Sequence, residues 1–325
     1  MAILPVILYH ARLGCPGGFV GVDVFLVISG FLIASILIRE IDGGTYSALD
    51  FWERRIRRIV PALAVVVVAT WAAGWLLFLP MDFKSVGTSI AVQPAMAANV
   101  VFWRDARYFS PDLETKPLLH TWSLAVEEQF YVGFPLLLVL LAKYRRVPRT
   151  MALAGLVAGS FALSVYGSHW HPTPTFYLLP TRAWELLVGA LLATSRGRMP
   201  IVPAVREAAG WGGLGLVLYS VARFDDQTRF PGLAALVPCI GAALILLSSE
   251  GQASAVGRIL GWRPFVFVGW VSYSLYLWHW PVLAFAKYQS TGQQGVAIRA
   301  AWLLASFGLA VVCQQRREIR LISTV

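Results

Sequence analysis

Residues 19–38 read FVGVDVFLVISGFLIASILI, and the only charged side chain among them is Asp23. A helix that crosses the hydrocarbon core of a bilayer needs about 20 mainly apolar residues. The stretch has this length and composition, so it predicts a membrane-spanning helix. A carboxylate inside such a helix is unusual, because charged groups are costly in lipid and commonly serve a function there.

Apolar runs of similar character recur along the whole chain. They cover residues 1–10, 59–79, 85–103, 120–142, 151–168, 176–195, 207–222, 231–248, 264–286 and 296–313. Ten spans would occupy roughly 200 residues, which leaves short loops and no room for a sizeable soluble domain. We expect an all-α polytopic membrane protein with about ten transmembrane helices in one bundle over residues 1–313, followed by a short cytoplasmic tail at 314–325.

The composition supports a membrane protein. Hydrophobic residues make up 58% of the chain and charged residues 14%, against about 45–50% and about 25% in soluble domains. The net charge of +10 comes from 27 Lys and Arg against 17 Asp and Glu. Because the basic residues cluster at span ends, they are explained by the positive-inside rule, and we expect the lipid bilayer rather than nucleic acid as a partner.

The Lys and Arg residues predict the topology. They gather in loop 39–58, in loop 143–150 and in the tail: Arg39, Arg54, Arg55, Arg57, Arg58, Lys143, Arg145, Arg146, Arg149, Arg316, Arg317 and Arg320. If all three segments are cytoplasmic, one apolar run between the two loops does not cross. We expect this run to be 85–103, as a re-entrant or interfacial segment, because it contains Gln93, Pro94 and Asn99. Both termini are then cytoplasmic, and residues 80–119 face outward.

Polar side chains mark the segment HTWSLAVEEQFY at 120–131. At helical spacing His120, Ser123, Glu127 and Tyr131 share one face. An imidazole and a carboxylate about two turns apart can act as an acid/base pair around one cavity. The alternative is a hydrogen-bonded cluster that only holds helices together.

The segment FWERRIRRIVP at 51–61 places four arginines at the expected cytoplasmic end of a span. Arg54 and Arg57 stand three positions apart, as do Arg55 and Arg58, so each pair is adjacent on a helix. Guanidinium groups suit phosphate or carboxylate ligands. By the residues alone, anchoring in the interface or contact with lipid headgroups is the simpler explanation, because such clusters are common at span ends.

Two further segments combine polar and aromatic residues. Arg182 and Glu185 lie one turn apart near the outer end of a span, as a structural ion pair or part of a substrate site. The aromatic run WVSYSLYLWHWP at 270–281 carries His279; it suits an interfacial belt or a floor on which a sugar stacks.

Several sequence motifs are absent. The chain has no GxxxxGK[ST], no HExxH and no GxSxG, so the P-loop, zinc-protease and α/β-hydrolase patterns do not apply. Cys15, Cys239 and Cys313 are far apart, and we expect neither a disulfide framework nor a metal site.

Six motifs follow one another in order and together carry a family resemblance. They are GGFVGVDVFLVISGFLI at 17–33, FWERRIRRIVPAL at 51–63, PLLHTWSLAVEEQFYVGFPLLL at 117–138, FYLLPTRAWELLVGALLA at 176–193, FPGLAALVPCIGAALIL at 230–246 and SYSLYLWHWPV at 272–282. From about residue 2 to about residue 312 the chain resembles the acyltransferase-3 family of bacterial integral-membrane O-acyltransferases. This family decorates the O-antigen of lipopolysaccharide and other exported polysaccharides.

The resemblance implies a location and a reaction. The protein would lie in the bacterial cytoplasmic (inner) membrane and transfer an acetyl group from cytoplasmic acetyl-CoA, or another acyl-CoA, to a hydroxyl of an exported glycan or lipid-linked sugar. The family's first-helix histidine falls on His10. Its Arg-x-x-Arg falls on Arg55 and Arg58, with Arg54 and Arg57 as the overlapping pair.

Two more family motifs fall on residues of this chain. WSLxxExxFY covers Trp122, Ser123, Leu124, Glu127, Phe130 and Tyr131, and SGF covers Ser29, Gly30 and Phe31. We expect His10 to act as a general base on the acceptor hydroxyl or to accept the acyl group transiently. Catalytic groups around it would be Glu127, His120 and Ser123, and the arginines would hold the phosphates of CoA. The expected substrate cavity adds Asp23, Ser29, Trp122, Tyr131, Arg182, Glu185 and His279.

Departures from the family pattern lie at both ends. The basic residue that the family carries eleven positions before the histidine would precede Met1, and the final segment, CQQRREIRLISTV at 313–325, does not match. We expect an abnormal start and end, and a chain without the SGNH domain of some relatives. The alternative functions are a transporter of an acyl donor or lipid-linked sugar, or an inactive member of the family.

Overall fold

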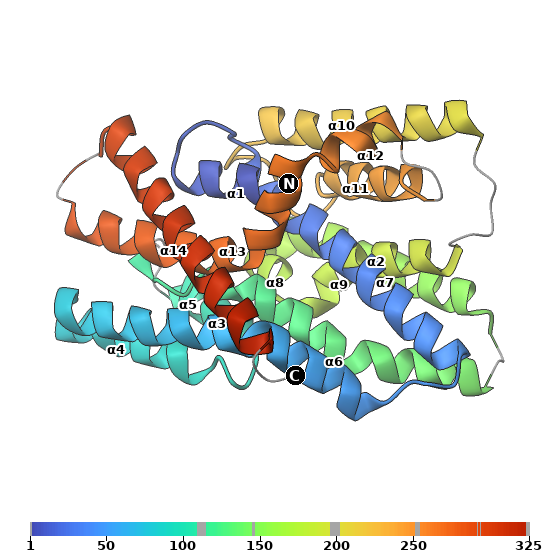
Figure 1. The fold of residues 1–325 in the computed structure, drawn as a ribbon, viewed down its shortest axis with the longest axis horizontal. Helices are drawn as coiled ribbons and strands as arrows, with labels where there is room; N and C mark the ends of the chain where they lie inside the picture. Colours follow the sequence, from blue (N-terminus) through green and yellow to red (C-terminus); the bar gives the residue numbers. More distant parts are fainter. Residues whose placement is uncertain are drawn as a thin grey trace. The chain divides into compact units, whose positions relative to one another are not determined.

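The computed structural model describes residues 2–108, 115–144, 147–195, 202–250, 254–290, 292 and 294–322, with side chains up to 315 and not at 107–108. Every regular element within them is helical (Figure 1), as the sequence predicted. The helices are α1 Ile3–His10, η1 Gly18–Val20, α2 Gly21–Asp42, α3 Ala48–Leu77, α4 Pro80–Ala91, α5 Ala98–Tyr108, α6 Thr121–Tyr144, α7 Arg149–Trp170, α8 Pro172–Tyr177, α9 Leu179–Ser195, α10 Pro203–Arg223, α11 Leu236–Ser248, α12 Ala255–Leu260, α13 Arg263–Gln289 and α14 Val296–Ile322. Arg145, Arg146 and residues 109–114 of the expected outer loop lie outside the described residues, as do the side chains of Arg316, Arg317 and Arg320.

Six helical segments in the described part of the chain are long and apolar enough to cross a bilayer. They are Gly18–Asp42, Ala48–Leu77, Thr121–Tyr144, Arg149–Trp170, Pro172–Ser195 and Val296–Gln315. A multi-pass membrane protein therefore fits the structure. Helices α10, α11 and α13 occupy three further apolar runs, and a total of ten crossings stays a prediction.

The run 85–103 is interrupted in the structure. Helix α4 ends at Ala91 and α5 begins at Ala98, and the side-chain amide of Gln93 between them donates to the hydroxyl of Thr121 at 2.9 Å. At about 1.5 Å per residue each helix is only ~18 Å long, against a hydrocarbon core of about 30 Å. Neither helix can cross by itself, which fits the expectation that this run does not span.

The chain divides into two compact units. The first comprises Met1–Val6, Cys15–Tyr46 and Val126–Val266, and the second comprises Ile7–Gly14, Ser47–Ala125 and Phe267–Val325. In the first unit α9 packs against both α2 and α7, and α10 packs against α11. The second unit contains α3, α4, α5 and α14.

Helices α2 and α9 approach each other at two glycines. A Cβ added at Gly30 would lie 1.9 Å from the carbonyl oxygen of Leu186, and one at Gly189 would lie 2.0 Å from the carbonyl oxygen of Val27. No side chain fits at either place, so the backbones themselves are in contact. Small residues at helix crossings permit this close packing in membrane proteins.

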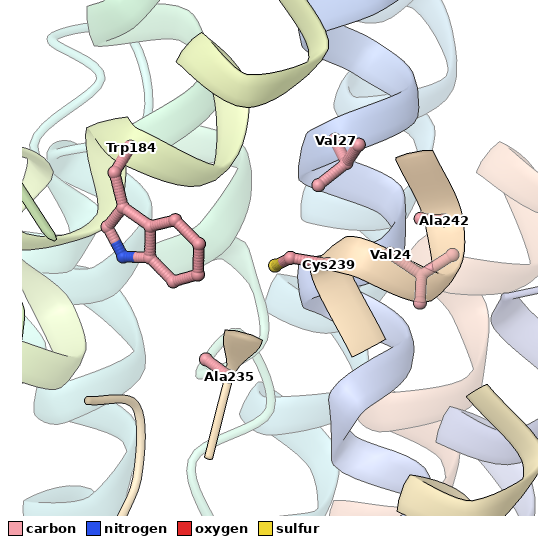
Figure 2. Close-up of a cluster of buried hydrophobic side chains, with 6 residues drawn as sticks. All are labelled: Val24, Val27, Trp184, Ala235, Cys239 and Ala242. Atoms are coloured by element: carbon pink, nitrogen blue, oxygen red, sulfur yellow. The ribbon is translucent and has the colours of Figure 1, made fainter. Parts of the chain in front are cut away.

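A buried apolar cluster joins three helices of the first unit. Figure 2 shows the indole of Trp184, from α9, turned toward Cys239 of α11, with Val24 and Val27 of α2 beside them. Trp184 and Cys239 are each 1% exposed. This packing holds the first turns of α2, α9 and α11 together.

In the second unit a serine side chain caps the N-terminus of α3. The hydroxyl of Ser47 accepts a hydrogen bond from the backbone N–H of Asp50 at 3.3 Å, as an N-cap residue does. Farther along, Ala62 and Val66 are buried in one cluster with Leu124 and with Leu277 of α13. The arginine run therefore lies in the first part of α3, just before the residues Ala62 and Val66 that pack into this cluster.

Candidate functional site

Three histidines from distant parts of the chain meet in the second unit. Nδ1 of His10, at the end of α1, lies 3.1 Å from Nε2 of His279 in α13. The ring of His120, which immediately precedes α6, lies 5.7 Å from that of His279 between centroids. His120 is 3% exposed and His279 is fully buried, so His279 is not a surface residue of an aromatic belt.

Aromatic side chains surround His10. The ring of Trp280 meets it edge-on with the centroids 4.6 Å apart, and Tyr9 lies against it at 5.3 Å. These contacts restrict the orientation of the imidazole. A titratable ring held among aromatic groups suits proton transfer to a bound substrate.

Arg299 stabilises the end of helix α1 that carries His10. Its Nη1 donates to the carbonyl oxygen of Arg12 at 2.7 Å and to that of Ala11 at 3.3 Å. Both carbonyl groups belong to the two residues that directly follow α1, and a cation close to the C-terminus of a helix is favourable. Arg299 was not among the residues predicted from the sequence; its signal was an arginine inside the apolar run 296–313.

The segment before α6 is attached to α13 by hydrogen bonds. The hydroxyl of Tyr276 donates to the carbonyl oxygen of His120 at 2.6 Å and lies 2.6 Å from the hydroxyl of Ser123. Nε1 of Trp280 donates to the carbonyl oxygen of Lys116 at 2.8 Å. Because the hydroxyl of Tyr276 donates its proton to the carbonyl oxygen of His120, the hydroxyl of Ser123 must be the donor in the bond between Ser123 and Tyr276. Together these hydrogen bonds hold the backbone of His120 against α13.

The four arginines lie on the first turns of α3. Arg55 is half-buried, while Arg54, Arg57 and Arg58 are exposed. Arg57 forms an ion pair of 2.6 Å with Glu53, four positions earlier. The arrangement presents a strongly basic helix surface that can bind phosphate groups.

Helix α13 connects the arginine run to the histidines. The hydroxyl of Tyr273 donates to the carbonyl oxygen of Ile59 at 3.1 Å, next to the last arginine of the run. Since Leu277 packs with Ala62 and Val66, α3 and α13 run in the same direction here. His279 then lies ~9 Å beyond Tyr273 along the helix, on the side away from the arginines.

The first unit contains a separate hydroxyl–carboxylate cluster. The hydroxyl groups of Ser29 in α2 and of Tyr131 in α6 both donate to Oε1 of Glu127, and they also contact each other. Glu127 is 5% exposed. The structure thus gives Glu127 and Tyr131 a partner in α2, whereas Ser123, on the predicted common face, has its partner in α13.

The first unit also buries an ion cluster. Nη2 of Arg182 lies 3.0 Å from Oδ1 of Asp23 and 3.2 Å from Oε2 of Glu185. The guanidinium group also lies over the rings of Phe176 and Phe230, at 5.7 and 5.8 Å from their centroids. All three charged residues are at most 1% exposed, so each charge depends on the others for compensation.

The predicted site residues therefore fall into distinct groups. The second unit brings together His10, His120 and His279, with Ser123 nearby and the arginines on α3, while the first unit holds the clusters around Glu127 and Arg182. Trp122 is buried at the start of α6. Tyr276 and Trp280 were not predicted as individual site residues; their signal was their place in the aromatic run around His279.

Comparison with known proteins assigns a family. Residues 1–314 match a family model described as an acyltransferase domain. The chain is 31% identical over 299 residues to the peptidoglycan O-acetyltransferase OatA of Listeria monocytogenes, covering 87% of this chain and 48% of that protein. It is 29% identical over 312 residues to the O-acetyltransferase OatA of Staphylococcus aureus, covering 90% and 51%. The chain spans about half the length of these curated relatives, and no solved structure matches it.

Proposed function

The chain belongs to the acyltransferase-3 family, and on this premise we propose that it is an integral-membrane O-acyltransferase that moves an acetyl group from acetyl-CoA to a glycan hydroxyl. The observation that carries the proposal is the combination, within one compact unit, of an arginine run on α3 with a histidine cluster in which His120 and His279 are buried and His10 is half-buried. The arginines suit the phosphates of the donor. The histidines suit the proton transfer that an alcohol acceptor requires.

The shape of coenzyme A fits this spacing. Its phosphates lie at one end, and its thioester lies at the far end of a long pantetheine arm. The arginines and His279 stand at different levels of the parallel helices α3 and α13. We infer that the phosphates bind at the cytoplasmic mouth and that the arm extends along these helices toward His10.

We infer that the reaction is a transfer from thioester to alcohol. His10 takes the proton of the acceptor hydroxyl, and the oxygen attacks the carbonyl carbon of the thioester. The carbon–sulfur bond breaks, and the departing thiolate takes up the proton that His10 received. An acyl-histidine on His10 is the alternative route to the same products.

The acceptor class that we propose is a cell-wall glycan. The sequence motifs led us to expect an O-antigen or another exported polysaccharide, but the relatives do not support lipopolysaccharide. The name of the Listeria relative specifies peptidoglycan. A peptidoglycan sugar hydroxyl on the outer side of the bacterial cytoplasmic membrane is therefore the acceptor to test first. In the topology that we propose, both termini of this chain lie in the cytoplasm.

The test is His10→Ala in cells that produce the full chain, with O-acetyl groups on the purified cell-wall glycan measured by NMR. General-base catalysis contributes about 10²–10⁴-fold, so acetylation should fall by about that factor while the protein still inserts. His169→Ala is the matched control, because His169 is exposed and its ring contacts only the backbone of its own helix among the bonds described. Wild-type acetylation with His10→Ala would transfer the catalytic role to His120 with Glu127, which the double variant His10→Ala/Glu127→Gln examines.

A transporter is the second candidate, because the interrupted helix pair α4 and α5 has the form of the broken helices found in transporters. The two functions differ in their product. A transferase in vesicles releases the free thiol of CoA from acetyl-CoA when the glycan acceptor is present, whereas a transporter moves the donor intact.

A further inference from the structure

We propose that His279 is a positioning residue that selects the tautomer of His10 and leaves Nε2 of His10 as the basic nitrogen. The inference rests on the proposed function, in which His10 handles the acceptor proton. The open question is which ring nitrogen of His10 takes the acceptor proton, and which neighbouring group determines this.

The hydrogen bonds of His279 determine where its own proton lies. Nδ1 of His279 lies 2.7 Å from the carbonyl oxygen of Tyr276 and 3.2 Å from that of Leu275. A carbonyl oxygen only accepts hydrogen bonds, so Nδ1 must carry the hydrogen. In a neutral imidazole the other nitrogen, Nε2, then has a lone pair and can only accept.

The hydrogen bond between the two histidines then determines where the proton of His10 lies. Nε2 of His279 faces Nδ1 of His10 at 3.1 Å, and since Nε2 accepts, Nδ1 of His10 must donate. The two rings are within 11° of parallel with centroids 5.3 Å apart. This is the arrangement of two nearly coplanar imidazoles that meet nitrogen to nitrogen, because face-to-face stacking would bring the centroids closer.

The consequence is a defined base on His10. With its hydrogen on Nδ1, a neutral His10 carries its lone pair on Nε2, which can take a proton from an acceptor hydroxyl. After that transfer His10 is a cation, and its Nδ1–H still donates to His279. The carbonyl of Tyr276, His279 and His10 thus form a chain of hydrogen bonds that ends at the accepting nitrogen Nε2 of His10.

The surrounding residues keep this chain in place. His279 is fully buried within α13, and the edge of Trp280 meets the ring of His10. His120 meets the ring of His279 at an interplanar angle of 72°. It therefore packs against the His279 ring without lying in the plane of the bond to His10.

The direct test is ¹⁵N NMR of the full chain in detergent micelles with labelled histidine, because the nitrogen shifts distinguish the two tautomers. The chain has five histidines, so single His→Gln variants assign every signal. We expect His279 and His10 each to be protonated at Nδ1, and His10 to lose this preference in His279→Leu. A wild-type His10 with its proton on Nε2 would overturn the proposal, whatever the activity of the protein.

The kinetic test compares His279→Leu with His279→Gln. Leu removes the acceptor for Nδ1–H of His10, whereas the side-chain oxygen of Gln can still accept there. Loss of tautomer control lowers turnover in other enzymes by up to about 10⁴-fold, and for His279→Leu we expect kcat to fall by at least about tenfold with an unchanged KM for acetyl-CoA. His279→Gln should restore most of kcat.

The possible failures of the two proposals are separable. If the wild-type chain transfers no acyl group, the proposed function fails, and the NMR measurement still decides the tautomer. If His10→Ala abolishes transfer but both His279 variants turn over like the wild type, only the positioning role is wrong. If His279→Leu does not fold, the NMR signals of the wild type and the kinetics of His279→Gln decide whether His279 positions His10.

Discussion

The two compact units each bury a cluster of ionisable side chains, and they do so in opposite ways. In the first unit the guanidinium of Arg182 pairs with the two carboxylates of Asp23 and Glu185, and all three lie on two helices whose backbones touch at glycines. In the second unit His10 and His279 share a hydrogen bond between imidazoles, which need no opposite charge while they are neutral. Removing one partner from a buried ion cluster is strongly destabilising, whereas neutral imidazoles can gain and lose protons. We therefore assign a structural role to the first cluster and chemistry to the second.

The largest effect should follow from breaking the ion cluster. Arg182→Met leaves two buried carboxylates without their cation, and removal of one partner from such a cluster costs about 3–5 kcal/mol. This is a large share of the total stability of a protein, about 5–15 kcal/mol. We expect a much lower unfolding midpoint in detergent and little accumulated protein.

The control for this prediction replaces the whole cluster. Asp23→Leu/Arg182→Met/Glu185→Met removes every charge, and apolar replacement of a buried ion cluster is commonly neutral or stabilising. The triple variant should fold better than Arg182→Met. If it folds but no longer transfers acetyl, the cluster also belongs to the substrate cavity, as the sequence predicted; if Arg182→Met is as stable as the wild type, the structural role is wrong.

A smaller effect, on the use of acetyl-CoA rather than on folding, is expected in the second unit. Arg55→Ala/Arg58→Ala removes the two charge-assisted contacts that we propose for the donor phosphates, each worth about 1.5–3 kcal/mol. The acetyl-CoA concentration for half-maximal rate should rise by more than about tenfold, while the unfolding midpoint stays near that of the wild type. Initial rates over a range of acetyl-CoA concentrations measure this.

The matched control is Arg149→Ala. Arg149 also lies at an expected cytoplasmic helix end, but it pairs with Asp42 at 2.7 Å in the first unit. An exposed pair of this kind contributes only about 0–1 kcal/mol, so the variant should use acetyl-CoA normally. If the double variant also keeps its dependence on acetyl-CoA, the arginines are only membrane anchors.

The smallest effects test the packing of the first unit. Gly30→Ala places a Cβ against the carbonyl oxygen of Leu186, and such overpacking costs about 1–3 kcal/mol. Gly133→Ala on α6 meets open space and should raise helix stability by about 0.5–1 kcal/mol. Thermal unfolding of both variants in the same detergent compares them, and equal midpoints would contradict the close contact of α2 and α9.

Much of the architecture could be predicted from composition and local pattern. The all-α membrane class follows because the free energy of burying a helix in lipid accumulates residue by residue. The interruption in 85–103 was visible in Gln93, Pro94 and Asn99, whose polar or ring-closed groups disfavour an unbroken apolar helix. The number of membrane crossings was harder to predict, because α10, α11 and α13 combine apolar runs with short length or polar residues.

The candidate site was predictable as a set of residues but not as a set of contacts. Helical periodicity placed His120, Ser123, Glu127 and Tyr131 on one face, yet it says nothing about which helix lies opposite each of them. In the structure Ser29 of α2 meets Glu127, and Tyr276 of α13 meets Ser123. Arg299 could be noticed only as an arginine in an apolar run, because its role depends on where α1 ends.

The sequence by itself therefore determined the membrane environment, the family, the basic end of α3 and the identity of the ionisable residues in the spans. Only the tertiary structure decided that His10 bonds His279 and that Asp23 pairs with Arg182. The reason is physical. Hydropathy and helix propensity act over neighbouring residues along one helix, whereas a hydrogen bond or ion pair between helices exists only when packing brings two remote side chains within about 3 Å.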